Sequence, residues 1–242
     1  MTTTASRTQR RVRDGAYILA VVPLLRWLVA HHAVAPGTAW RTRCDTYSSL
    51  LWPAACGPSG RCRTCQARIG ASPYWLEAVA ALAIGLLVAS GARGWELAAY
   101  TWWTAGMLVL GFVDAAVLRL PHRLTAATTA GTVVLLAPLG GPASSWWSAA
   151  ISAAVLAGFY ALTRIISRGD LGLGDVAFAV PVGFGAGWYD WRLAVAAVVV
   201  GHTLAAAGIV GRRITGRPSS PLPLGTYLVA ALLAVVVVHR IT

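Results

Sequence analysis

Residues 192–211 read RLAVAAVVVGHTLAAAGIVG, an apolar run of twenty residues without an acidic residue. A helix of about 20 such residues spans the hydrocarbon core of a bilayer. Seven further runs predict membrane segments at 16–35, 74–90, 96–113, 124–139, 147–166, 174–189 and 222–239. The first run is weakened by Pro23 and Arg26, and the sixth by its glycines and Pro181. The pattern predicts an all-α polytopic membrane protein with about eight transmembrane helices.

The composition agrees with this fold class. Of the 242 residues, 57% are apolar and 12% are charged, whereas soluble domains carry about 25% charged residues. A disordered chain would need low hydrophobicity and high charge. The formal net charge is +12, and every basic residue is arginine. In a soluble protein this excess would suggest a nucleic-acid partner, but in a membrane protein it orients the chain. We therefore expect contact with lipids and no nucleic acid.

The arginines predict an orientation. If the loop 36–73 is cytoplasmic, twelve arginines lie in cytoplasmic loops and the outer loops contain only Arg93 and Arg192, as the positive-inside rule predicts. This places the protein in the inner (cytoplasmic) membrane as a multi-pass protein. The twelve are Arg41, Arg43, Arg61, Arg63, Arg68, Arg119, Arg123, Arg164, Arg168, Arg212, Arg213 and Arg217.

The N-terminal segment does not fit this orientation. Four arginines between positions 7 and 13 would lie outside. Residues 1–35 could instead be a secretory signal peptide with a small-residue cleavage site at Ala33-Val34-Ala35. Arg26 interrupts its apolar run and Pro36 follows the cut, and the arginine-rich loops would then face outward. The topology of residues 1–35 is left open.

Two acidic residues lie at the ends of membrane segments. Asp114 follows the run 96–113, and Asp175 begins the run 174–189. The two segments between them return the chain to the same face, so helix packing could bring both carboxylates together. Two close carboxylates share a proton and titrate as a pair, which is the arrangement that activates water in aspartic proteases. Either residue could also be an interfacial carboxylate that reaches water, or part of a proton relay.

The residues around the aspartates favour a protease. Gly172 and Gly174 allow a substrate backbone to come close to Asp175. Pro121 ends or kinks the helix that carries Asp114.

The motifs at these positions resemble those of the type IV prepilin peptidases. The stretches 111–114 (GFVD) and 120–125 (LPHRLT) resemble the first-aspartate motif, and 171–176 (LGLGDV) resembles the GxGD motif of this and presenilin-like proteases. Residues 221–225 (PLPLG) look like the element before the last helix. The resemblance runs from about residue 60 to the C-terminus. It departs where the family often has lysine after GxGD and this chain has Val176-Ala177-Phe178.

The resemblance implies a membrane aspartic endopeptidase with Asp114 and Asp175 as its catalytic pair. Its substrates would be type IV prepilins or pseudopilins, cut at the cytoplasmic face without any cofactor. The predicted membrane segments and loops divide the chain into an N-terminal tail with the first membrane segment (1–35), a cytoplasmic cysteine loop (36–73) and, given the resemblance, a membrane-embedded peptidase domain (74–242). Bifunctional members also methylate the cleaved pilin with S-adenosylmethionine, but the short and altered cysteine loop argues against this activity here.

Three other acidic residues have structural explanations. Asp170 lies in the loop before Asp175, as a solvated residue or a partner of Arg168. Asp190 lies in an outer turn among aromatic residues. Glu77, at the start of a membrane helix, would act as a cap or on the helix dipole.

All four cysteines, Cys44, Cys56, Cys62 and Cys65, fall in the loop 36–73. The pair Cys62–Cys65 has the spacing of a zinc knuckle, and Cys44 and Cys56 could complete a tetrahedral thiolate site. The alternative is inert or redox-active thiols. The family has two CxxC pairs in this loop, and only the second half matches well.

Two other functions stay open at this stage. A proton-coupled transporter could use the same acids as a relay in broken helices, although the two aspartates lie at one interface and not at the midplane. A non-catalytic component of a secretion or pilus assembly system is the other. The sequence does not indicate the particular pilin or the oligomeric state.

Overall fold

The computed structural model describes residues 21–35, 37–216 and 222–241, and their regular structure is helical apart from two isolated β-bridges. The all-α prediction is confirmed, and these residues contain eight helices of eleven residues or more. They are α2 (Val22–His32), α4 (Trp75–Ala89), α5 (Gly94–Val117), α6 (His122–Leu136), α7 (Ala143–Ile166), α8 (Leu173–Gly187), α9 (Trp191–Ile214) and α10 (Leu224–Ile241). The short α3 (Leu51–Ala54) and the 3-10 turn η1 (Ala137–Leu139) join them.

The apolar character of the helices supports the membrane class. Within the described residues, α7 and α9 are each long and apolar enough to cross a bilayer, and α4, α8 and most of α10 are shorter apolar helices. The number of spans stays a prediction. The arginines before residue 21 and most of the proposed signal peptide lie outside the described residues.

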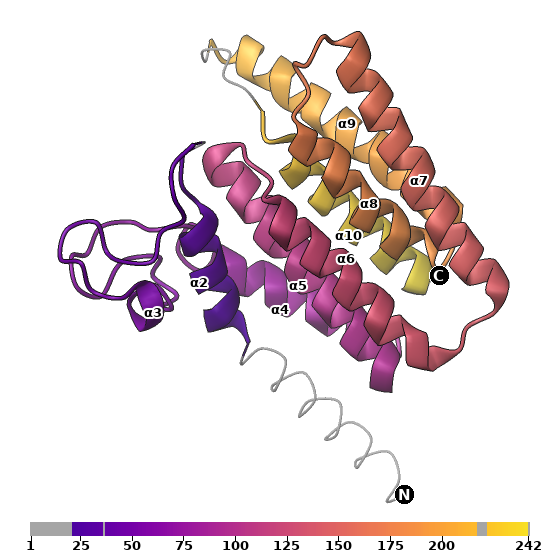
Figure 1. The fold of residues 1–242 in the computed structure, drawn as a ribbon, viewed down its shortest axis with the longest axis horizontal. Helices are drawn as coiled ribbons and strands as arrows, with labels where there is room; N and C mark the ends of the chain where they lie inside the picture. The colour runs from indigo at the N-terminus through magenta and orange to yellow at the C-terminus, as the bar shows by residue number, and fades with distance from the viewer. Residues whose placement is uncertain (1–20, 36, 217–221, 242) are drawn as a thin grey trace, which may run out of the picture.

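The helices pack mainly as neighbouring hairpins. The pairs α5–α6, α7–α8 and α9–α10 each lie side by side, and α10 also packs on α5 while α6 packs on α8 (Figure 1). The region between α2 and α4, which contains α3 and the four cysteines, lies at one flank of this bundle (Figure 1). These pairings bring the α5–α6 link, the α7–α8 link and the start of α10 together, and these elements build the site described below.

Small residues allow α7 and α8 to pack closely. A Cβ atom at Gly183 would lie 2.6 Å from the Ser152 carbonyl oxygen, and one at Gly187 would lie 2.6 Å from the Ser152 Cβ. Glycines spaced four apart are typical of membrane helices whose backbones touch, because van der Waals packing takes the place of the hydrophobic effect in lipid.

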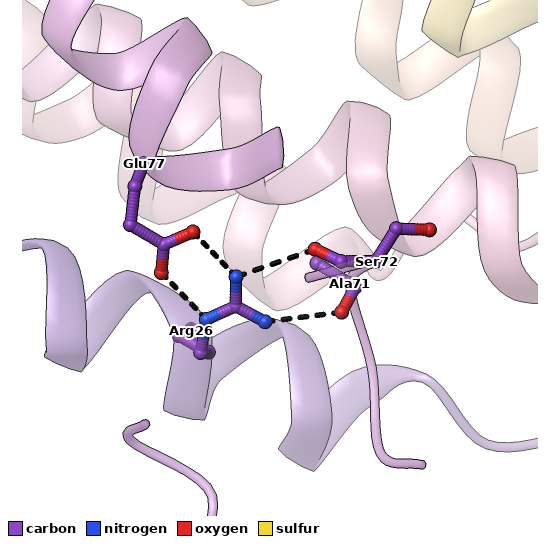
Figure 2. Close-up of polar contacts among 4 residues, drawn as sticks. All are labelled: Arg26, Ala71, Ser72 and Glu77. Atoms are coloured by element: carbon purple, nitrogen blue, oxygen red, sulfur yellow. Dashed lines mark hydrogen bonds and ion pairs between the residues drawn. The ribbon is translucent and has the colours of Figure 1, made fainter. Parts of the chain in front are cut away.

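A buried ion pair joins α2 to the start of α4. Arg26 has no exposed surface, and its guanidinium contacts the Glu77 carboxylate at 2.7 Å and 2.5 Å (Figure 2). The same group donates hydrogen bonds to the Ala71 and Ser72 carbonyl oxygens at 3.0 Å and 3.3 Å (Figure 2). Glu77 therefore neutralises a buried cation, which is more specific than the helix-dipole role expected from the sequence.

We expect Gly183→Ala to destabilise the protein by about 1–3 kcal/mol, because the new methyl group overpacks the α7–α8 contact. Gly158→Ala in α7 is the matched control, since a Cβ there meets no atom within 4 Å. Thermal unfolding in detergent measures both. Equal midpoints for the two variants would contradict the close α7–α8 packing.

We expect Glu77→Ala to cost about 3–5 kcal/mol, because it leaves the Arg26 charge buried and unpaired. The double variant Arg26→Met/Glu77→Met should recover most of this loss. As a control, Asp45→Ala removes an exposed partner of Arg41 at 3.3 Å, and surface pairs of this kind contribute about 0–1 kcal/mol. The unfolding midpoints of the three variants test whether the buried Arg26–Glu77 pair contributes more to stability than the exposed Arg41–Asp45 pair.

Candidate active site

Asp114 lies in the last turn of α5 and is only 5% exposed. The helix ends at Val117 because Leu118 adopts a left-handed conformation (φ +53°) and donates its N–H to the Asp114 carbonyl oxygen at 2.8 Å. The sequence predicted that Pro121 ends or kinks this helix, but α5 already ends at Val117. Pro121 precedes the first residue of α6 in an extended conformation.

The start of α10 holds the Asp114 carboxylate. Thr226 donates its N–H to Asp114 Oδ2 at 3.1 Å, and its hydroxyl donates to the Gly111 carbonyl oxygen at 2.8 Å. The first N–H groups of a helix have no partner within it and attract negative charge. A Cβ at Gly225 would lie 2.9 Å from Asp114 Oδ2, so this approach requires glycine. Gly225, the last residue of the element 221–225, therefore lies against the Asp114 carboxylate, while Pro221 lies outside the described residues.

Asp175 occupies the first turn of α8. Its Oδ2 accepts the Gly172 N–H at 3.1 Å, so the side chain caps its own helix. A Cβ at Gly174 would lie 3.0 Å from the Leu120 Cβ and 3.1 Å from its carbonyl oxygen. The absence of a side chain at position 174 therefore lets α8 pack against the α5–α6 link and brings Asp175 toward Asp114.

Both carboxylates line one cavity of about 790 Å³. The loop before α8 is held in place by Arg164, which donates to the carbonyl oxygens of Gly169 and Leu171. The cavity is lined by Gly37, Trp40, Asp114, Leu118, Arg119, Leu120, Pro121, His122, Arg123, Gly172, Leu173, Gly174 and Asp175. All five residues expected at the site from the sequence, namely the two aspartates, Gly172, Gly174 and Pro121, meet there.

The sequence did not indicate that residues before the peptidase helices reach this cavity. The Arg119 guanidinium lies 4.1 Å from the Trp40 ring centroid, a cation–π contact, and donates to the Ala35 carbonyl oxygen at 3.5 Å. The Trp40 ring also lies against His32, at 4.8 Å between centroids. In the sequence, the only feature that could have indicated this contact is the basic character of the α5–α6 link, residues 118–123.

The three other acidic residues lie outside this site. Asp170 is exposed and does not line the cavity, and neither ion pair among the described residues involves it. Asp190 caps α9 by accepting the Arg192 N–H at 2.9 Å, which is the structural role expected. Glu77 is occupied by Arg26.

Three of the four cysteines form a group that could hold a metal ion such as zinc. The Sγ atoms of Cys44, Cys62 and Cys65 all lie within 4.8 Å of one another, and ligand atoms around a tetrahedral zinc with bonds of about 2.3 Å are roughly 3.8 Å apart. Backbone N–H groups of Tyr47 and Thr46 lower the pKa of the Cys44 thiol to about 7, which favours the thiolate that binds metal. Cys56 is not in this group, and burial raises the pKa of its thiol.

Comparison with known proteins agrees with the geometry. No curated protein and no solved structure gives a significant match. The model of the type IV leader peptidase family matches residues 100–239, a range that contains both aspartates, the cavity links and the start of α10. Because this range is more than half of the chain, the protein belongs to the type IV leader peptidase family.

Proposed function

We propose that Asp114 and Asp175 are the catalytic pair with which this prepilin peptidase removes the leader peptide of a type IV prepilin or pseudopilin. The family match supports the activity. The observation that carries the choice of residues is that two carboxylates 61 residues apart in the sequence, Asp114 in α5 and Asp175 in α8, line one cavity.

The pair can supply both halves of acid–base catalysis. One carboxylate is ionised and takes a proton from a water molecule, whose oxygen attacks the scissile carbonyl carbon. The other is protonated and donates a hydrogen bond to the carbonyl oxygen as negative charge develops on it. The tetrahedral intermediate then collapses, the peptide C–N bond breaks, and the leaving nitrogen takes the proton that the first carboxylate accepted from the water molecule. No side chain forms a covalent bond with the substrate.

The cavity suits an extended peptide. Gly172 and Gly174 beside Asp175 carry no side chain that would keep a substrate backbone away. Trp40 and Arg119 close another side of the cavity. The helix links that surround the site carry arginines counted above as cytoplasmic, which supports a site at the cytoplasmic face of an eight-span protein.

We also propose that zinc bound by the cysteine region has a structural role. The zinc would stabilise the fold of the region that supplies Trp40, and no step of the peptidase chemistry passes through it. Support comes from the three clustered thiols and from the small size of the apolar cluster around them.

We expect Asp114→Asn and Asp175→Asn each to lower the rate of leader cleavage by about 10²–10⁴-fold, since each removes one partner of the acid–base pair. The assay uses purified protein in detergent with a prepilin-like peptide that has a basic leader, a glycine and an apolar helix. Asp170→Asn, an exposed residue in the same loop, should cleave at the wild-type rate. Undiminished cleavage by either of the first two variants would refute the pair.

We expect Trp40→Ala to raise KM more than it lowers kcat, because it removes a wall of the cavity and leaves both aspartates in place. Trp52→Ala is the matched control: this tryptophan is 49% exposed and lies in the same region, but does not line the cavity. Steady-state cleavage kinetics separate the two parameters. An equal effect of both variants would show that Trp40 acts only through the stability of the region.

A further inference from the structure

Two hairpins in the cysteine region have the same hydrogen bonds, offset by 18 residues. In the first, Cys44 donates its N–H to the Ser49 carbonyl oxygen at 2.7 Å and accepts the Ser48 N–H at 3.0 Å. The corresponding bonds in the second run from Cys62 to Ala67 at 2.9 Å and from Gln66 to Cys62 at 2.9 Å. The two cysteines therefore occupy equivalent positions.

The residues around this pair of bonds repeat at the same offset. Each hairpin has one antiparallel bridge, one residue in the left-handed region, and one arginine that donates to the carbonyl oxygen of that residue. The bridges are Arg43–Leu50 and Arg61–Arg68, the left-handed residues are Ser48 (φ +53°) and Gln66 (φ +60°), and the donors are Arg43 at 3.0 Å and Arg61 at 2.9 Å. The cysteine region therefore contains two copies of one hairpin, with Cys44 and Cys62 at the same position in each copy.

The repeat shows which ligand is missing. The offset of 18 pairs Cys65, the second thiol of the CxxC motif, with Tyr47. The Tyr47 side chain is 63% exposed, and a tyrosine is too long to place its hydroxyl where the sulfur of a cysteine would lie. The first hairpin therefore contributes one thiol to the group and the second contributes two.

Cys56 does not supply the missing fourth ligand. It follows α3 in the segment between the hairpins and has no equivalent in the repeat. Its sulfur is not one of the atoms that lie within 4.8 Å of one another. By contrast, Cys44 Sγ lies 3.4 Å from Cys65 Sγ, and the Thr64 N–H donates to Cys62 Sγ at 3.4 Å.

We propose that the cysteine region binds one zinc ion through Cys44, Cys62 and Cys65, and that the fourth coordination position, where the repeat has Tyr47, takes an exogenous ligand such as water or a small nitrogen base. Four protein ligands close the coordination sphere of a zinc ion, whereas three protein ligands leave one position at which an exogenous ligand can exchange. Cys44, one of the three thiol residues, lines a cavity of about 610 Å³. The proposal concerns metal coordination alone and does not rest on the catalytic assignment.

Cobalt(II) substitution of the full-length protein in detergent tests the coordination. We expect one cobalt per chain and a thiolate-to-cobalt charge-transfer band that Cys62→Ser abolishes. Tyr47→Cys restores the second thiol of the first hairpin, so the band should rise by about one third, in proportion to four thiolates in place of three. Imidazole should shift the visible d–d bands of the wild type and leave those of Tyr47→Cys unchanged.

Cys56→Ser is the decisive control, since it should leave the cobalt stoichiometry and both spectra unchanged. A weaker charge-transfer band in Cys56→Ser would show that Cys56 is the fourth ligand and would overturn the proposal. A wild-type protein that binds no cobalt, or whose bands do not respond to imidazole, would overturn it as well. Peptide cleavage is not used as a readout, so a failure of this proposal is distinct from a failure of the catalytic pair.

Discussion

Each of the two aspartates depends on an N–H group at the start of a helix. Asp114 accepts one from Thr226 in the first turn of α10, and Asp175 accepts one from Gly172 at the start of α8. Carboxylates among apolar helices are costly to bury unless hydrogen bonds compensate them. Helix N-termini supply both donors and a favourable dipole, and within the described part of the chain neither carboxylate forms an ion pair with an arginine.

This constraint explains the glycines of the motifs. Gly225 and Gly174 stand where a side chain would collide with the Asp114 carboxylate or with Leu120. A larger residue at either position would push a helix start away and separate the two carboxylates from each other. The glycines near the aspartates therefore act first through packing, and the access they give to a substrate backbone follows from the same lack of side chains.

Much of this could be predicted from the sequence, because apolar length and the number of crossings are local properties. The seven segments from 74 onward correspond to α4–α10, and two intervening helices were enough to place Asp114 and Asp175 at one end. Contacts between distant residues could not be predicted in this way. Thr226 lies 112 residues from Asp114, and Trp40 meets Arg119 only because the region before α4 folds back onto the bundle. The exclusion of Cys56 from the thiol group depended on hairpin geometry, which spacing alone does not reveal.

The cysteine region has only a small hydrophobic core of its own. Its buried cluster consists of small residues and cysteines together with two larger aliphatic side chains: Ala30, Cys44, Leu51, Ala54, Ala55, Cys62 and Ile69. A core of this size is too small to fold alone, and small domains of this kind usually depend on a metal or on disulfides. Contacts that join the region to the helices include the hydrogen bonds from the buried Arg26 to the Ala71 and Ser72 carbonyl oxygens and the Arg119–Trp40 contact. Loss of the proposed zinc would therefore loosen the Trp40 side of the cavity, while the hydrogen bonds of both aspartates, which come from α8 and α10, stay in place.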